Sequence, residues 1–500
     1  FFIYTFYKKI VIYILNHEQI LYNDIVGDNM NKTKMIATIG PSSKSKETIK
    51  KMILEGVDVI RINMSHSSFE DARDIILKIR ELNRELSVIT GIMIDTRGPE
   101  IRITELEKNK VKLIKGNTIR IIKNNIKGNE NMISLSLPDV INYIKAGEKI
   151  LVNDGNVALE VVSNSSDALI CEIKNDGYIK SNCSVNIPKA NFNLRFLSDY
   201  DRETIKFAVL MQVDYIALSH VNDQLDILDV NDLLIELSDD HIQIISKIEN
   251  KNAIENIEEI LKVSNGVMVA RGDLGIEIEI EKIPSVQKKI ATKAKKAEKI
   301  CIIATEMLST MQENPRPTRA EVSDVANAVL DGTDAVMLSS ETAIGKYPVE
   351  TVSTMNKIID EIENEIDYND LLLEFDRKDK TDIPTAIAYS TVDSANRINA
   401  DAIVCSTMTG LTAKKISHFR PSAPVIAISP IEKTVSGLTI NYGIIPVKVP
   451  MLDSTDEIIE KSSIISKETL KLEPKSKIVI AGSFPLNVEY TNFLRIEEIE

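Results

Sequence analysis

The sequence is poor in cysteine and has no block of Lys or Arg interleaved with aromatics, and each absence excludes a class of protein. Its four cysteines form no CxxC pair, which argues against a structural zinc site and fits a reducing cytoplasm. The five histidines show no metal-ligand spacing either. Because the formal net charge is −14 and no Lys/Arg run is interleaved with aromatics, we expect no nucleic-acid binding.

Long apolar runs are also missing. The apolar runs near the N-terminus are too short for a membrane-spanning helix of about 20 residues, so we expect no membrane association. The stretch MNKTKMIATIG from Met30 reads like a natural start. We therefore interpret residues 1–30 as an upstream artefact or a loose, disordered extension, with a targeting remnant as the alternative.

Short apolar runs recur eight times, and most are separated by a helix-like segment such as SKETIKKMILEG. Buried strands that alternate with helices indicate a parallel sheet, and eight such units fit a (β/α)8 barrel, or TIM barrel. A doubly wound open sheet is the alternative. The predicted strands are residues 35–39, 57–62, 91–95, 213–218, 242–248, 266–270, 301–305 and 334–338.

Two further blocks interrupt and follow this barrel. More than 100 residues separate Asp95 from Val213, and stretches such as VKLIKGNTIRII alternate like antiparallel strands, which predicts an inserted β domain. After about Glu363 the pattern restarts as a separate α/β domain. The expected division is a barrel of residues 31–104 and 188–362, an insertion at 105–187 and a C-terminal domain at 363–500.

Charged side chains follow the strands at the end where barrel enzymes place their active sites. Lys247 and Glu249 lie two residues apart, so they share one face of a strand. Asp273 follows the next strand, and two carboxylates at adjacent strand ends suit Mg²⁺ or Mn²⁺. A buried Lys–Glu ion pair is the alternative, although the ARGDLG turn around Asp273 also offers free backbone N–H groups to an anion.

Arginines and small polar residues follow the second and third strands. Arg61, Arg97 and Arg102 are typical of phosphate binding, with a salt-bridged rim as the alternative. Next to them, a weak oxygen site for a monovalent cation is predicted from Asn63, Ser65, Asp95 and Thr96. Together these groups fit phosphoryl transfer. Since the sequence has no GxxxxGKS/T loop and no HRD or DFG motif, a nucleotide must be held in another way.

Long motifs in a shared order resemble the pyruvate kinase family from about residue 32 onward. They are TKMIATIGPSS, RINMSH, IDTRGPEIR, ISKIEN, VMVARGDLGIEI, NPRPTRAEVSDVANAVLDGTDAVMLSSETAIGKYP and HFRPSAPVIAIS. The resemblance implies a TIM barrel with an inserted β-barrel lid domain and a C-terminal α/β regulatory domain. It also implies a cytoplasmic glycolytic enzyme, usually a homotetramer, that transfers phosphate from phosphoenolpyruvate to ADP and yields pyruvate and ATP.

The resemblance assigns roles to individual residues. The catalytic residues would be Lys247, Thr305 and Arg61, with Lys247 stabilising the migrating phosphoryl group. The substrate carboxylate would meet the amides of Gly272 and Asp273. The other implied sets are Glu249 and Asp273 for Mg²⁺ or Mn²⁺, Asn63, Ser65, Asp95 and Thr96 for K⁺, and Asn63, His66 and Arg102 for the nucleotide. Because Glu100 stands where members indifferent to K⁺ tend to carry lysine, we expect K⁺ activation.

The loop STMTGLT precedes the helix AKKISHF in the C-terminal domain. A phosphate could bind at this helix N-terminus through Thr407, Thr409, Gly410 and Thr412, although a plain capped turn explains these residues equally well. The resemblance implies a sugar-phosphate or nucleotide effector. Because AGSFPLNVEYTNF lacks the basic residue of some bisphosphate-activated members, we expect a monophosphate effector or none.

The sequence also departs from the family pattern. Glu306 replaces a usual glutamine, SHVN at 219–222 replaces a common SFVR, and Cys183–Ser184 stands where a nucleotide-contacting Lys–Gly is usual. A catalytically weakened homologue that binds phosphometabolites or a partner subunit is therefore one alternative function. A Mg²⁺-dependent barrel lyase acting on a 2-oxo acid is another, but it does not explain the C-terminal domain.

Overall fold

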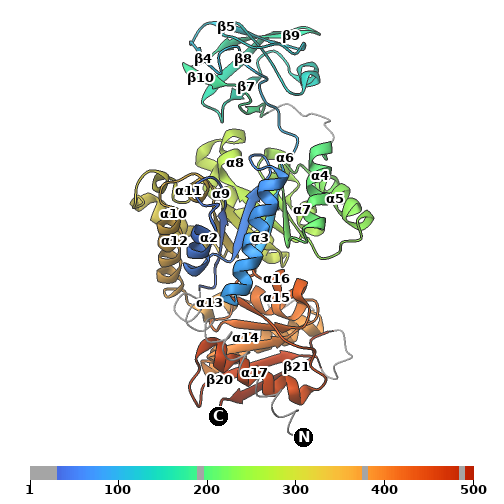
Figure 1. The fold of residues 1–500 in the computed structure, drawn as a ribbon, viewed down its shortest axis with the longest axis vertical. Coiled ribbons are helices and arrows are strands. Elements are labelled where there is room, and N and C mark those ends of the chain that lie inside the picture. The colour runs from blue at the N-terminus through green and yellow to red at the C-terminus, as the bar shows by residue number, and fades with distance from the viewer. Residues whose placement is uncertain (1–30, 189–195, 374, 376–380, 484–489) are drawn as a thin grey trace.

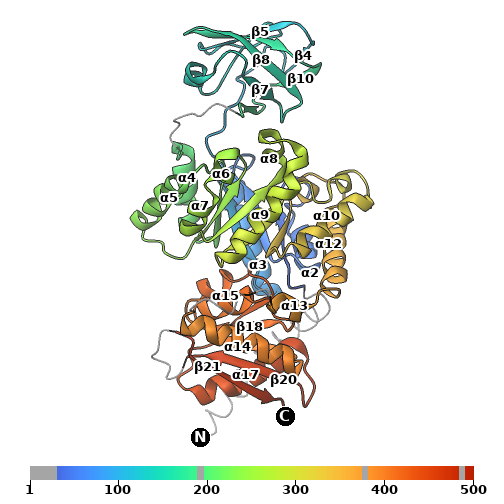
Figure 2. The same ribbon diagram turned by 180° about the vertical axis from the view of Figure 1, so that it is seen from behind.

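The computed structural model describes residues 31–188, 196–373, 375, 381–483 and 490–500. The extension expected at residues 1–30 lies outside these residues. Figures 1 and 2 show three bodies stacked along the longest axis, with a β domain at one end, a barrel in the middle and an α/β domain at the other end.

Eight parallel strands close into a barrel in the order β1-β16-β15-β14-β13-β12-β3-β2, which confirms the TIM barrel and excludes the open sheet. Each strand begins within two residues of the predicted start, and nearly all strand residues are buried because helices cover the outside. The strands are β1 (Lys34–Thr38), β2 (Val59–Asn63), β3 (Gly91–Asp95), β12 (Tyr215–Leu218), β13 (Gln243–Ile248), β14 (Gly266–Ala270), β15 (Ile300–Ala304) and β16 (Ala335–Leu338).

Several of the barrel helices start at side-chain caps. Ser68 accepts a hydrogen bond from the Asp71 amide at the start of α3, and Thr318 and Glu321 form a capping box on α10. The helices are α2 (Lys46–Leu54), α3 (Phe69–Leu86), α4 (Asp199–Leu210), α5 (Gln224–Glu236), α6 (Lys251–Glu255), α7 (Ile257–Val263), α8 (Arg271–Glu277), η2 (Ile280–Lys282), α9 (Ile283–Lys296), η3 (Ser309–Gln312), α10 (Arg319–Leu330), α11 (Ser340–Ala343) and α12 (Pro348–Glu363).

The inserted domain consists of a six-stranded sheet in the order β11-β7-β8-β9-β5-β6 and a two-stranded sheet of β10 and β4. Its pairs are antiparallel as expected, except that β5 and β6 run parallel. Alternating buried residues along these strands form one apolar core. The elements are β4 (Lys110–Leu113), β5 (Thr118–Ile122), β6 (Met132–Ser134), η1 (Pro138–Tyr143), β7 (Lys149–Val152), β8 (Val157–Asn164), β9 (Ala168–Ile173), β10 (Gly177–Lys180) and β11 (Val185–Asn186).

The C-terminal domain has a five-stranded sheet in the order β19-β18-β17-β20-β21. The edge strand β21 pairs antiparallel with β20 and was not predicted, because its charged, half-exposed residues carry little strand pattern. The elements are α13 (Tyr368–Leu373), α14 (Ile383–Ile398), β17 (Ala402–Ser406), α15 (Leu411–His418), β18 (Val425–Ser429), α16 (Glu432–Ser436), β19 (Ile444–Lys448), α17 (Thr455–Leu470), β20 (Lys477–Gly482) and β21 (Phe493–Glu498).

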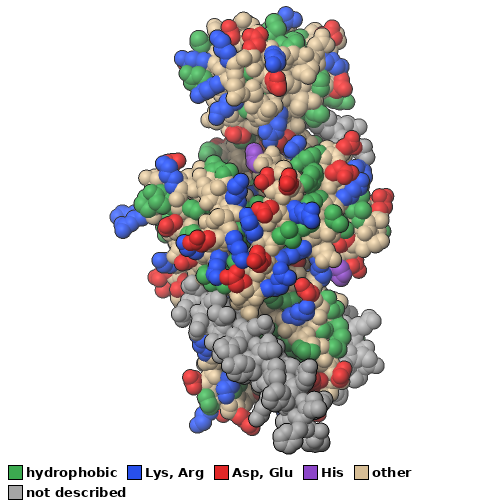
Figure 3. Space-filling model, viewed as in Figure 1, with side chains coloured by type: hydrophobic (Ala, Val, Ile, Leu, Met, Phe, Trp, Pro, Cys, Tyr) green, Lys and Arg blue, Asp and Glu red, His purple; other side chains and the backbone are tan. Residues whose placement is uncertain are grey.

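A segment of the C-terminal domain closes the amino end of the barrel. Ile440 belongs to the apolar cluster inside the barrel, and the Tyr215 hydroxyl lies 3.1 Å from the Thr439 hydroxyl. Gly91 makes this approach possible, since a Cβ there would lie 2.3 Å from the Thr439 hydroxyl oxygen. The opposite, carboxyl end of the barrel faces the inserted domain, and Figure 3 shows a narrow waist between them. In the described part of the chain, no helix has the length and apolar character needed to cross a membrane.

Protonation of His418 in the unfolded chain should weaken folding in mild acid. Burial, together with the positive charges of Arg420, Lys295 and Lys415, lowers the pKa of His418 to about 3. An unfolded histidine takes up its proton near pH 6.5, so stability is lost as pH falls from about 6.5 towards 3, by up to about 1.4 kcal/mol per pH unit. Urea unfolding of the native protein and of His418→Phe, compared at pH 7 and pH 5, measures this loss.

The phenylalanine should keep the ring contacts that His418 makes with Phe375 and Phe419, at centroid distances of 4.9 and 5.2 Å. Between pH 7 and pH 5, we expect the free energy of unfolding of the variant to fall by about 2 kcal/mol less than that of the native protein. His241→Phe is the control, because this side chain is 53% exposed. An identical pH dependence in all three proteins would contradict the prediction.

Candidate active site

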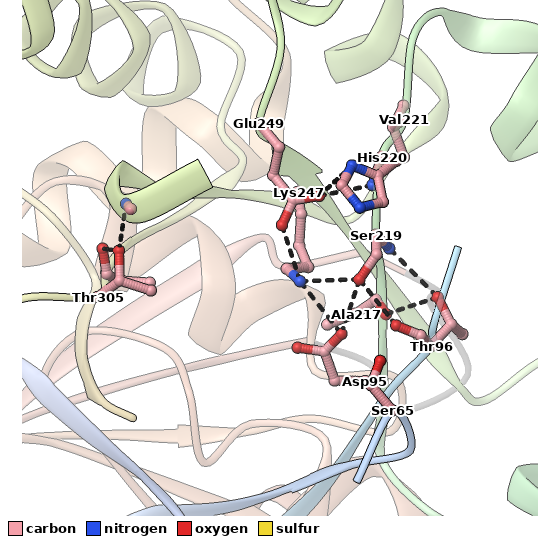
Figure 4. A network of polar contacts seen from close by, with 12 residues as sticks. Ser65, Asp95, Thr96, Ala217, Ser219, His220, Val221, Lys247, Glu249 and Thr305 are labelled. Atoms are coloured by element: carbon pink, nitrogen blue, oxygen red, sulfur yellow. Dashed lines mark hydrogen bonds and ion pairs between the residues drawn. The ribbon is translucent and has the colours of Figure 1, made fainter. Parts of the chain in front are cut away.

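Lys247 stands at the centre of a buried polar network at the carboxyl end of the barrel (Figure 4). Its Nζ lies 2.8 Å from Glu249 Oε1 and 3.3 Å from Asp95 Oδ1, and it donates to the Ser219 hydroxyl at 2.8 Å. Burial by itself lowers the pKa of Lys247, but the charges of Asp95 and Glu249 outweigh burial and raise it. The ammonium is therefore held charged and in one place.

Asp95 joins Lys247 to Arg61. The carboxylate of Asp95 has no exposure to solvent and accepts a hydrogen bond from Arg61 Nε at 2.6 Å. Arg61 also donates from Nη1 to the Thr38 hydroxyl at 2.9 Å. Because Asp95 contacts both side chains, it holds the Arg61 guanidinium near the Lys247 ammonium. The strand ends therefore present a pair of cations to an incoming anion.

Ser219 is a site residue that the sequence analysis did not single out. It follows β12, accepts from Lys247, and its hydroxyl lies 3.0 Å from Asp95 Oδ1 and 2.7 Å from the Thr96 carbonyl. The motif SHVN contains this serine, but nothing in its spacing shows that its hydroxyl reaches two other strands. The signal that could have found it is its position directly after a barrel strand.

Glu249 and Asp273 form the acidic side of the site. Burial raises the pKa of Asp273, and the charge of Glu249 raises it further, so the two carboxylates share one electrostatic environment. Lys247 and His220 outweigh the effect of burial on Glu249 and lower its pKa. One buried and one partly exposed carboxylate that repel each other fit a divalent cation. Among the described residues, no three His, Cys, Asp or Glu side chains form a preassembled metal group.

Thr305 lies where β15 ends, next to the first turn of α8. Its hydroxyl accepts from the Gly272 amide at 2.8 Å and lies 2.6 Å from the Ala304 carbonyl. Thr305 and Glu306 have φ values of 68° and 54°, which are rare for residues other than glycine. Arg271 holds this strained turn by donating to the Thr305 carbonyl at 2.7 Å and the Glu306 carbonyl at 3.1 Å.

The four oxygen-bearing residues expected around a monovalent cation come from the last residues of β2 and β3 and from the loops that follow them. Asn63 Oδ1 accepts from the Ser65 amide at 2.9 Å, and the Thr96 hydroxyl lies 3.4 Å from the Ala217 carbonyl. Asp95 connects this group to the Lys247 network.

The outer arginines and His66 make separate contacts. Arg97 stacks over the Tyr200 ring at 3.9 Å, which favours the structural alternative for this arginine. Arg102 donates to Glu100 Oε2 at 2.7 Å and to the Asn182 carbonyl at 2.8 Å, next to the inserted domain. The exposed His66 donates its amide to the Asn63 carbonyl at 3.2 Å.

The C-terminal loop predicted to bind an effector is held by its own hydrogen bonds. The Gly410 amide donates to the Thr407 hydroxyl at 2.9 Å, and Thr412 shares a hydrogen bond with Thr491. Thr434 donates to the Met408 carbonyl at 2.7 Å. Gly410 has a φ of 84° and directly precedes α15, which has no side-chain cap. The loop is thus a turn held by hydrogen bonds, in which Thr409 lies between two anchored residues.

Comparison with known proteins shows two family matches. Residues 30–352 match the family model described as pyruvate kinase, barrel domain, and residues 385–497 match the one described as pyruvate kinase, alpha/beta domain.

Several curated proteins named pyruvate kinase are similar to this chain. The protein from Clostridium perfringens is 41% identical over 476 residues, covering 94% of this chain and all of the relative. The protein from Clostridium acetobutylicum is 38% identical over 473 residues, with 94% and 100% covered. The protein from Staphylococcus aureus strain MRSA252 is 40% identical over 470 residues, which is 93% of this chain and 80% of the relative.

Proposed function

This chain belongs to the pyruvate kinase family, and from that premise we propose which residues carry the transfer of phosphate from phosphoenolpyruvate to ADP. The observation that supports the assignment is the buried Lys247 ammonium, held between Glu249 and Asp95 at the mouth of the barrel. Phosphoryl transfer depends mainly on positioning and charge stabilisation, and this site supplies fixed positive charge.

Lys247 would stabilise the negative charge of the migrating phosphoryl group, and Arg61 would hold its oxygens. The Arg61 guanidinium is anchored by Asp95 and Thr38 but keeps N–H donors for a ligand. The carboxylate of phosphoenolpyruvate would bind at the amides of Gly272 and Asp273, replacing the hydrogen bond between Gly272 and Thr305. The Thr305 hydroxyl, released from that bond, would help to deliver a proton to the enolate.

Metal dependence follows from the family, and we propose Mg²⁺ or Mn²⁺ at Glu249 and Asp273. The burial of Glu249 and the mutual repulsion of the two carboxylates support this assignment. When bound there, such an ion neutralises negative charge on the phosphate oxygens. The nucleotide would lie near Asn63, His66 and Arg102, where the inserted domain approaches the barrel.

The test is a coupled assay of the full chain with phosphoenolpyruvate, ADP, Mg²⁺ and K⁺. Formation of ATP and pyruvate supports the proposal. Binding of phosphoenolpyruvate without turnover would instead indicate the weakened homologue, and cleavage of a 2-oxo acid would indicate the lyase.

Activity should depend on K⁺. We propose that Asn63, Ser65, Asp95 and Thr96 bind this ion beside the phosphoryl site, as the position of Glu100 in the sequence favours. Replacing K⁺ by tetramethylammonium at equal ionic strength should lower the rate of ATP formation at least about 10-fold, because one positive charge near the phosphate is lost. Returning K⁺ should restore the rate. An unchanged rate without K⁺ would contradict the assignment.

The effector proposal is a monophosphate at Thr407, Thr409, Gly410 and Thr412, or no effector. Titrating sugar monophosphates, AMP and a sugar bisphosphate while the cooperativity of phosphoenolpyruvate is followed tests this. We expect a response to a monophosphate or no response, and activation by the bisphosphate alone would contradict it.

We propose further that the enzyme is a cytoplasmic homotetramer, with the domain division at 31–104 and 188–362, 105–187, and 363–500. Gel filtration with light scattering measures the oligomer. A single-chain mass would contradict the tetramer.

A further inference from the structure

His220 places an imidazole next to the acidic side of the site. It follows Ser219 at the end of β12, and its Nδ1 lies 3.4 Å from Glu249 Oε2 (Figure 4). Its side chain is 25% exposed, whereas that of Glu249 is 1% exposed. The imidazole therefore lies between the buried carboxylate and the open mouth of the barrel.

The backbone and the ring of His220 are both held in place. Its φ is 58°, and its amide donates to Glu249 Oε2 at 2.6 Å while its carbonyl accepts from Asn222. Gly98 packs against the other side of the ring, since a Cβ on Gly98 would lie 3.0 Å from His220 Cδ2. Contact at Cδ2 directs the opposite edge of the ring, which carries Nδ1, towards Glu249.

The distance between Nδ1 and Glu249 Oε2 is longer than an ordinary hydrogen bond of about 2.7–3.2 Å. It is close to the separation of two neighbouring ligands on one ion, which is roughly 3 Å for bonds near 2.1 Å at right angles. The imidazole thus adjoins Glu249, one of the two carboxylates of the proposed metal site.

We propose that His220 is a nitrogen ligand of the divalent cation, beside Glu249, and that it shifts the metal preference of this protein from Mg²⁺ towards Mn²⁺ and Co²⁺. Mg²⁺ favours oxygen ligands, whereas imidazole nitrogen favours transition metals. This inference rests on the proposed metal site at Glu249 and Asp273. Among the described residues His220 and these two carboxylates do not form a preassembled group, so the three side chains would converge only around a bound ion.

The test uses Mn²⁺ as the probe and the full chain without substrate, at about pH 8, where metal-binding imidazoles are deprotonated. In the native protein, the spin-echo modulation spectrum of bound Mn²⁺ should contain the signal of a directly coordinated nitrogen. His220→Phe should lose that signal and bind Mn²⁺ about 10-fold more weakly. The ratio of Co²⁺ to Mg²⁺ affinity should fall by a similar factor.

His220→Asn is a second variant, because asparagine tolerates the positive φ of this position better than phenylalanine. His241→Phe is the control, since it changes an exposed histidine before β13. Equal Mn²⁺ affinity and no nitrogen signal in the native protein and both His220 variants would overturn the inference. If Mn²⁺ binding is nevertheless lost in Glu249→Gln, the proposed metal site stands; if it survives there, both proposals fail.

Discussion

Replacing Lys247 by methionine should lower the rate of ATP formation at saturating substrate by about 10³-fold or more. Methionine keeps much of the length and volume of lysine but removes the ammonium that touches both Glu249 and Asp95. The migrating phosphoryl group would then face two carboxylates without the cation between them. Since Glu249 and Asp273 remain, Mn²⁺ binding should stay within a few-fold of the native value.

The measurement combines the coupled assay with a Mn²⁺ titration followed by electron paramagnetic resonance. The substitution leaves Asp95 and Glu249 partly unpaired, which should also lower the free energy of unfolding by about 3–5 kcal/mol. Both assays should therefore be run well below the melting temperature of the variant. Lys251→Met is the matched control, because its side chain is 67% exposed on α6, one turn beyond the site. Turnover within 10-fold of native in a folded Lys247→Met protein would overturn the role of this lysine.

Changing Glu249 to glutamine should weaken Mn²⁺ binding by about 10- to 100-fold and lower turnover by about 10²-fold at ordinary metal concentration. The substitution keeps the shape of the side chain and an oxygen that can accept from the His220 amide. What it removes is one of the two negative charges that would attract the cation. Raising the metal concentration should therefore recover part of the lost turnover.

Glu255→Gln is the control for this experiment, since Glu255 is 61% exposed and pairs only with Lys251 among the ion pairs of the described chain. Native Mn²⁺ affinity in Glu249→Gln would show that the ion binds elsewhere. A turnover loss that no metal concentration relieves would instead indicate that Glu249 acts mainly by holding Lys247.

The sequence predicted the barrel well, because each unit of strand and helix carries its own periodic pattern. All eight predicted strands exist, and β3 and β14 match their predicted bounds. The edge strand β21 was missed because half of its residues carry charge and half are exposed, which leaves little apolar strand pattern. The parallel pairing of β5 with β6 was missed for another reason. The direction in which two strands pair depends on the path of the chain between them, and it produces no pattern in the local sequence.

Within the site, the sequence by itself determined which chemical groups follow each barrel strand, including the cation and the two carboxylates of Lys247, Glu249 and Asp273. Only the tertiary structure decided their partners. In the folded protein, Lys247 contacts Asp95 and Ser219 as well as Glu249, and His220 lies beside Glu249. The physical reason is that strand period and turn chemistry are local, whereas hydrogen bonds between neighbouring strands depend on the register of a closed sheet, which no single segment encodes.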